Sequence, residues 1–183
     1  MSQDGPRRFG RLLVAVAIFA TAAVSAAYAK EAMTEEAVRN QFVLAAEPEG
    51  ATSIVVAKGN LEKQADVAQP VLIVGQIGAR EHDPFLEGKA SFIMIDISDD
   101  GHAKKPGHDA DNCPFCKKRQ AKLPLAAVQF VDGDGKVILF DSRKLFGLSK
   151  GREVVVRGTA TYNTKLPMPV VQVTADAIHV RPK

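Results

Sequence analysis

The sequence contains no tryptophan and only two tyrosines in 183 residues, and its formal net charge at pH 7 is only +3. Proteins that bind single-stranded nucleic acid usually combine a strongly positive groove with aromatic rings that stack on the bases. A protein that grips a phosphate backbone also usually keeps a clear positive surplus. The low net charge and the small number of aromatic side chains therefore argue against nucleic acid as a partner of this protein.

Cysteine is equally scarce, since Cys113 and Cys116 are the only two in the chain. No second pair is present, so one chain cannot build a zinc site from four cysteines. No cysteine follows the apolar run near the N-terminus either, which argues against a lipid-anchored cysteine at that place.

The N-terminus has the pattern of a secretory signal peptide. Three arginines precede an uncharged, mostly apolar run over residues 12–27, and residues 27–29 read Ala-Tyr-Ala. A basic start, a short apolar stretch and a small-x-small end are typical of such a signal. The run is slightly shorter than the roughly 20 residues of a membrane-spanning helix. We therefore expect a cleaved signal over residues 1–29 and an exported protein, periplasmic or secreted, with an uncleaved membrane anchor as the alternative.

Removal of this segment would change the charge balance. Residues 1–29 contain three arginines and one aspartate, so the remaining chain would carry a formal charge of +1 instead of +3. Tyr162 would then be its only tyrosine. The basic character of the whole chain is therefore partly a property of the export signal.

Residues 30–69 are expected to form a helical lead-in. Over residues 30–46 Thr34 can cap a helix, two glutamates occupy the first turn, and apolar residues such as Val38 and Phe42 recur at helical spacing. Residues 51–69 are ambiguous between a strand and a short helix, and we expect a helix that leads into the next element.

From residue 70 to residue 183 the pattern is that of strands, with a short helix or turn over residues 142–151. Alternating and β-branched residues indicate the strands, and the DGDG sequence indicates a hairpin turn. Several short strands without regular βα alternation predict a mainly β fold, a small closed barrel with a short helix. The strands are expected over residues 71–79, 90–98, 125–131, 136–141, 152–162 and 169–180.

Parts of this strand region resemble OB-fold domains. LSKGREVVVRGTATY is similar to the strand that follows the small helix of that fold, and VLIVGQIGAR with ASFIMIDISDDG looks like its first strand pair. The resemblance covers about residues 70–180 and implies an OB-like barrel of five to six strands. The arrangement also resembles a group of exported bacterial OB-fold proteins with a cysteine-containing insertion after the second strand. That group implies no activity.

OB-fold domains commonly bind oligonucleotides or oligosaccharides on their second and third strands and on the loops beside them. Because this is an analogy at the level of the fold, the ligand-binding positions that it suggests are weak candidates. Phenylalanines in alternating strands belong more often to the core than to a binding surface. The weak candidates are Arg80, His82, Phe85, Phe92 and Phe130.

A polar insertion over residues 99–124 carries the most distinctive motif. Long insertions inside compact domains tend to be functional or disordered. His102, His108, Cys113 and Cys116 follow one another with gaps of five, four and two residues. Such sets of imidazoles and thiolates hold tetrahedral zinc, and soft thiolates also favour copper(I). The insertion therefore predicts a zinc or copper site at these four residues.

The residues around the cysteines are expected to activate them. Lys117, Lys118 and Arg119 follow the second cysteine and are expected to lower the pKa of both thiols. Asn112 is expected to cap a short helix that starts at Cys113, and the helix N-terminus would act in the same direction.

Other chemistries compete for the cysteine pair. An exported protein can hold it as a disulfide staple, and two free thiols are the remaining simple form. A thioredoxin-like catalytic pair usually follows a buried apolar strand, whereas this pair follows a polar segment. Covalent haem attachment needs a histidine after the second cysteine, where this chain has Lys117. If a metal is bound, His82 or His179 is an alternative fourth ligand.

No serine, cysteine or carboxylate stands at a readable spacing from a base, so we assign no catalytic residue and expect no enzyme activity. We expect an exported OB-fold binding module whose loop binds zinc or copper or is closed by a disulfide. Its ligand or protein partner is not specified by the sequence, and membrane contact is expected only through an uncleaved N-terminal segment. One alternative is an OB domain that binds oligosaccharide, nucleic acid or protein, with the loop as a staple. Another is a periplasmic thiol–disulfide enzyme.

Overall fold

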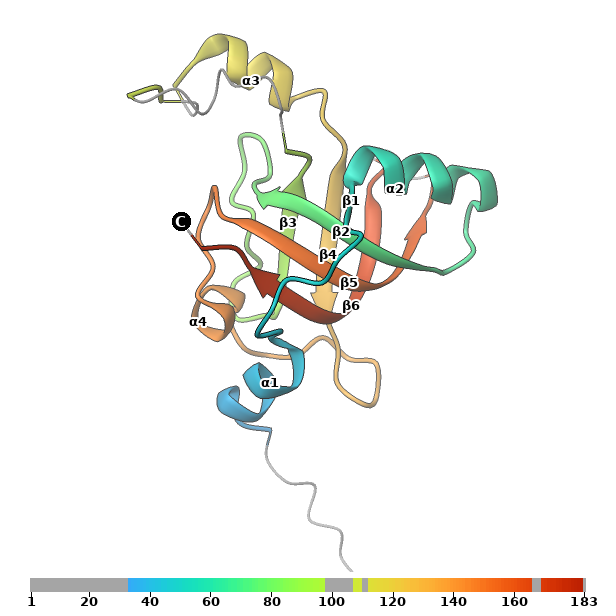
Figure 1. Cartoon of the computed structure of the whole chain (residues 1–183), viewed down its shortest axis with the longest axis vertical. Helices are drawn as coiled ribbons and strands as arrows, with labels where there is room; N and C mark the ends of the chain where they lie inside the picture. The colour runs from blue at the N-terminus through green and yellow to red at the C-terminus, as the bar shows by residue number, and fades with distance from the viewer. Residues whose placement is uncertain (1–32, 98–106, 110–111, 166–168, 183) are drawn as a thin grey trace, which may run out of the picture. The chain divides into compact units, whose positions relative to one another are not determined.

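Six strands form one sheet whose hydrogen bonding closes into a ring (Figure 1). A computed structural model describes residues 33–97, 107–109, 112–165 and 169–182. The strands are β1 (Thr52–Ser53), β2 (Gln69–Ile77), β3 (Ser91–Ile95), β4 (Leu125–Phe130), β5 (Glu153–Tyr162) and β6 (Val171–Val180).

The order of the strands explains the ring. Neighbours pair in the order β1-β2-β3-β4-β6-β5, and β2 also pairs with β5. This last pairing gives β2, β3, β4, β6 and β5 a bonded neighbour on each side. The pairs are antiparallel except β1 with β2 and β4 with β6. The predicted mainly β fold of five to six strands with short helices is confirmed.

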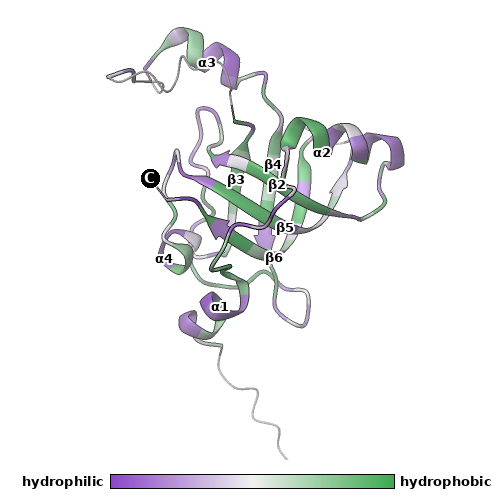
Figure 2. Ribbon diagram, viewed as in Figure 1, coloured by the Kyte–Doolittle hydropathy of each residue, from purple (hydrophilic) through white to green (hydrophobic). Residues whose placement is uncertain are grey.

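Alternate residues of the strands are buried and form the core. Along β5 and β6 buried residues alternate with more exposed ones over much of each strand, and Figure 2 shows apolar residues along β2 and β5. Phe130 on β4 lies at the centre of the aromatic contacts. Its ring centroid is 5.1 Å from that of Phe42 and 4.6 Å from that of Phe146. Burial of these rings therefore ties two helices to the sheet.

The first two helices agree with the prediction of a helical lead-in. In α1 (Glu35–Phe42) the hydroxyl of Thr34 accepts a hydrogen bond from the backbone N–H of Ala37 at 3.2 Å, as expected of an N-cap. The helix buries Val38 and Phe42. Residues 54–61 form α2 (Ile54–Leu61), which settles the ambiguous segment as a helix, and η1 (Glu62–Gln64) follows it.

Two further helices lie within the strand region. The first is α3 (Pro114–Gln120), which carries the second cysteine. The second is α4 (Ser142–Phe146), which confirms the short helix expected over residues 142–151. The carboxylate of Asp141 caps α4, and Gly147 ends it in the left-handed conformation at φ +67°.

One expected strand is absent and another is shorter than expected. Residues 136–141 form only an isolated bridge, Val131 with Val137. The turn before them is held by the carboxylate of Asp132, which accepts hydrogen bonds from the backbone N–H groups of Asp134 and Lys136. β3 ends at Ile95 instead of residue 98, and the chain then leaves the sheet. In both places the sequence pattern predicted strand residues that do not pair in the sheet.

The predicted signal peptide over residues 1–29 and the predicted metal ligand His102 lie outside the described residues. Within the part of the chain that is described, no helix is long and apolar enough to cross a lipid bilayer.

Candidate metal centre

The start of α3 presents both cysteines on one side of a helical turn. Cys113 is the N-cap and Pro114 occupies the first helical position, where its missing N–H leaves no hydrogen bond unmade. Cys116 follows three residues after Cys113, and residues at this spacing lie on the same face of a helix. The helix therefore begins one residue later than expected, and Asn112 is not its cap.

An aspartate turn precedes the helix and holds the chain in place. The backbone oxygen of Asp109 accepts a hydrogen bond from the N–H of Cys113 at 3.0 Å. Its carboxylate accepts from the backbone N–H of Asn112 at 3.3 Å and from the side-chain amide of Asn112 at 2.6 Å. This Asx-type turn places Cys113 next to the residue that precedes Asp109, which is His108.

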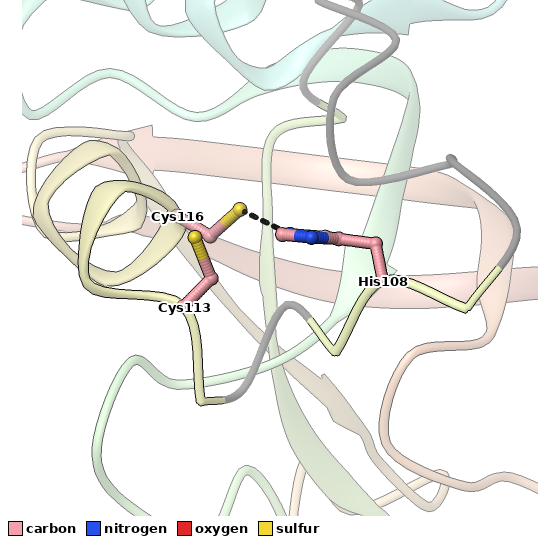
Figure 3. Close-up of side chains that lie close together, drawn as sticks. All are labelled: His108, Cys113 and Cys116. Atoms are coloured by element: carbon pink, nitrogen blue, oxygen red, sulfur yellow. Dashed lines mark hydrogen bonds between the residues drawn. The ribbon is translucent and has the colours of Figure 1, made fainter.

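His108, Cys113 and Cys116 converge on one point (Figure 3). Nε2 of His108 lies 3.2 Å from Sγ of Cys116, and the three potential ligand atoms all lie within 4.8 Å of one another. Cys116 is buried, whereas the other two residues are half-buried. The cysteine sulfurs are not bonded to each other.

The donor set fits a thiophilic metal ion. At zinc–sulfur and zinc–nitrogen bond lengths of about 2.3 and 2.0 Å, tetrahedral angles place the sulfur and nitrogen about 3.5 Å apart. The His108–Cys116 pair at 3.2 Å would need to open by only a few tenths of an ångström. Two sulfurs and one imidazole nitrogen match zinc or copper(I), whereas magnesium and calcium prefer oxygen donors.

The electrostatics of the site differ from the prediction. Burial raises the pKa of the Cys116 thiol, and the neighbouring Cys113 raises it further. A buried thiol loses the hydration that would stabilise its anion, and a second thiolate beside it would repel the charge. The cations at residues 117–119 lie on the last turn of α3 and do not reverse this effect. The prediction of a lowered pKa is therefore wrong for Cys116.

The other two histidines of the described residues, His82 and His179, are not part of this cluster. Among the described residues the only such group of three or more metal-binding side chains is His108 with the two cysteines. Nδ1 of His179 donates a hydrogen bond to the backbone oxygen of Leu44 at 3.1 Å, which ties β6 to the segment after α1. His82 lies in the loop after β2 and faces a different cleft.

The weak ligand-binding candidates separate into core residues and cleft residues. Phe92 and Phe130 are only 1% and 0% exposed, so neither ring offers a face on which a ligand can stack. Phe85 packs against the core and lies 5.4 Å beneath the guanidinium of Arg143. Arg80 and His82, in contrast, line a surface cleft.

Sequence reasoning missed some residues that shape this region. Asp109 positions the cysteines, and its signal was an aspartate followed three residues later by an amide that can fold back on it. Gln120 and Lys150 line the neighbouring clefts with Arg80. No local pattern could have found them, because they come from segments far apart in the chain.

Comparisons with known proteins give the chain no family. No family model matches the sequence, and no curated protein matches it. Among solved structures, it is similar to an aspartyl-tRNA synthetase from Entamoeba histolytica, with 10% identity, a TM-score of 0.40 and coverage of 76% of this chain. It is also similar to a protein described as an aspartyl-tRNA synthetase from Leishmania major Friedlin, with 14% identity, a TM-score of 0.37 and coverage of 79%. The match spans only 25% and 24% of those two chains.

Proposed function

We propose that this protein is an exported, non-enzymatic binding module that holds one zinc or copper(I) ion at His108, Cys113 and Cys116. The observation that carries the proposal is the convergence of three ligand atoms within 4.8 Å of one another. Export is supported by the signal-like pattern of residues 1–29 and by the resemblance to exported bacterial OB-fold proteins.

The surroundings of the three ligands support a metal centre. The Asp109 turn holds Cys113, and helix α3 holds Cys116, so two different backbone constraints bring the sulfurs to one place. A site in which the ligands are already close loses less conformational entropy when the ion binds. The burial of Cys116 also removes that sulfur from solvent and oxidants.

The number of protein ligands at the site affects copper(I) and zinc differently. Three ligands suffice for copper(I), which favours soft thiolates. Zinc usually takes four ligands, so a water molecule or His102 would complete its shell. Both ions remain in the proposal, and a direct competition between them decides which one the site prefers.

The setting of the cysteine pair weighs against a thiol–disulfide enzyme. In thioredoxin-like enzymes the pair follows a buried apolar strand in a βαβ unit. Here the pair follows the polar turn at Asp109, in an insertion between two strands of a β ring. A disulfide between Cys113 and Cys116 is the second candidate, because an exported protein meets oxidising conditions.

Native mass spectrometry of the reduced protein with added zinc or copper(I) tests the proposal. We expect one ion per chain, loss of the ion in Cys113→Ser and Cys116→Ser, and at least tenfold weaker binding in His108→Asn, because each change removes one ligand. His82→Asn is the matched control and should bind as the unmodified protein does. Absence of metal uptake, or uptake that survives both serine substitutions, would refute the metal centre.

Export is tested separately by the N-terminus of the protein recovered from the producing cell. A protein that begins at Lys30 supports cleavage after Ala29, because the Ala-Tyr-Ala end has the form of a signal-peptidase site. A protein that begins at residue 1 and remains in the cytoplasm would refute export without affecting the metal centre.

A further inference from the structure

A cleft of about 810 Å³ lies between the loop after β2, the sheet and helix α3. Sites for small organic molecules typically have volumes of about 300–1,000 Å³, so this cleft is large enough for one. Its lining comes from five segments of the chain: the loop after β2, strands β3 and β4, helix α3, and the loop before β5.

Arg80 lines this cleft and is held in place by the backbone. Its Nη2 atom donates a hydrogen bond to the backbone oxygen of Leu123 at 3.2 Å, so the guanidinium is held against the segment between α3 and β4. Its Nε atom is buried and has no hydrogen-bond partner among the described residues. A buried N–H without a partner is costly, and such groups in folded proteins often await a ligand or a water molecule.

The backbone of Arg80 is also strained. Its φ is +59°, in the left-handed region that residues other than glycine rarely adopt. A tight turn imposes this conformation, because the N–H of His82 donates to the backbone oxygen of Ala79 at 3.1 Å. Glycine would fit the turn without strain, so the side chain of arginine at this place points to a functional role.

The charges around the cleft are mostly positive. Lys117 and Lys150 line it together with Arg80, and Glu81 is its only acidic lining residue. The floor is apolar, with Ile93, Leu125 and two alanines. The lining therefore offers several cations beside a hydrophobic surface.

We propose that this cleft binds a small amphipathic organic anion, with its carboxylate on Arg80 and its apolar part over Ile93 and Leu125. A guanidinium presents parallel N–H groups that match the two oxygens of a carboxylate. The unpartnered Nε atom of Arg80 is one such donor, and Lys117 and Lys150 add attraction from both sides of the cleft. Burial of a hydrocarbon tail against the apolar floor supplies the remaining affinity.

This binding does not depend on the metal centre. None of the three metal-ligand candidates lines this cleft. The cleft and the metal centre share helix α3, which carries Lys117 and Gln120 on one face and Cys116 in its first turn, and His108 lines a neighbouring cleft with Arg80. A failure of one proposal therefore leaves the other unaffected.

Titration calorimetry with octanoate tests the proposal on the full-length, reduced and metal-free protein. We expect one octanoate per chain and at least tenfold weaker binding of octanamide, which has the same tail but no charge. Arg80→Gln should weaken octanoate binding at least tenfold and Lys117→Gln severalfold, while both bind octanamide as the unmodified protein does. Lys136→Gln, in the turn after β4 and outside the cleft lining, is the matched control.

Two results would overturn the proposal. One is octanoate binding no tighter than octanamide binding. The other is unchanged octanoate affinity in both Arg80→Gln and Lys117→Gln. Because Arg80 also contacts Leu123, thermal unfolding is used to check that Arg80→Gln is folded. If Arg80→Gln does not fold, the octanoate affinity of Lys117→Gln alone decides the test.

Discussion

The Nε2 atom of His108 lies 3.2 Å from the sulfur of Cys116, although seven residues lie between them in the chain. The polar turn at Asp109 and the start of α3 produce this contact together. A histidine and a thiol at this separation can share a proton, and they can also share a metal ion. A metal ion that binds between them must therefore displace the proton.

We predict that metal binding releases protons and becomes tighter as the pH rises. Burial raises the pKa of Cys116, so at neutral pH the thiol is protonated and the metal must displace its proton. At pH 7 we expect the release of about two protons per ion, one from each thiol. Titration calorimetry in buffers with different ionisation enthalpies measures this number. Heats that do not depend on the buffer would contradict the prediction.

Asp96 is predicted to be the carboxylate on which stability depends most. It is only 7% exposed, and it accepts hydrogen bonds at 3.3 Å from the backbone N–H groups of Ile54 and Val55 at the start of α2. Asp96→Ala would leave these buried donors without a partner, at a cost of about 1–3 kcal/mol in the free energy of unfolding. Urea denaturation measures the change.

The control for Asp96 is Asp176, which forms an exposed ion pair with Arg157. Asp176→Ala should lower the free energy of unfolding by less than about 1 kcal/mol, because exposed ion pairs contribute little. Equal losses for the two variants would contradict the role assigned to Asp96.

The ion pair between Asp141 and Arg143 is predicted to make stability depend on pH. The side-chain hydrogen bond from Arg143 holds the pKa of Asp141 well below its usual range. A lowered carboxyl pKa stabilises the folded state above the ordinary pKa of about 3.9, and this stabilisation is lost as the pH falls below that value. Asp141→Asn keeps a capping side chain but removes the charge.

Urea denaturation at pH 7 and pH 3 tests this prediction. The unmodified protein should be more stable than Asp141→Asn at pH 7, and the difference should shrink at pH 3. Asp141→Ala should lose about 1 kcal/mol more, because it also removes the helix cap. A difference between the unmodified protein and Asp141→Asn that stays constant with pH would contradict the assignment.

Gly158 is predicted to tolerate no side chain. It lies at the bulge where the register of β5 against β6 shifts, and a Cβ atom there would lie 2.8 Å from Cα of Ala175 and still closer to the backbone oxygen of Thr174. Gly158→Ala should lower the free energy of unfolding by about 1–3 kcal/mol, because the strand must move. Gly133→Ala, where a Cβ atom meets nothing within 4 Å, is the control in the same denaturation experiment and should change stability little.

Much of the fold was readable from local patterns. The N-cap of Thr34 and the strands of the ring follow from residue spacing and turn chemistry, because these depend on near neighbours, whereas the pattern of residues 51–69 left a strand and a helix open. The strand expected over residues 136–141 does not form, and after the turn at Asp132 only the bridge of Val131 with Val137 is present. The local sequence pattern indicates that a segment can form a strand, but the strand forms only where a neighbouring strand runs beside it.

The candidate metal centre was readable in composition but not in geometry. The spacing of His108, Cys113 and Cys116 singled them out, while the lowered thiol pKa expected from the following cations was wrong for Cys116. Sequence shows which charges are near along the chain, whereas burial and the distance to another thiol depend on the fold.

By itself the sequence determined the types of secondary structure, the scarcity of stacking aromatics and the presence of one cluster of soft metal ligands. Only the tertiary structure decided that Phe92 and Phe130 are core residues, that Asp96 caps α2, and that Arg80 faces a cleft shared with α3. The physical reason is that patterns along the chain reflect interactions between near neighbours. The burial of a side chain and the charges that surround it depend on segments that meet only when the ring of strands closes.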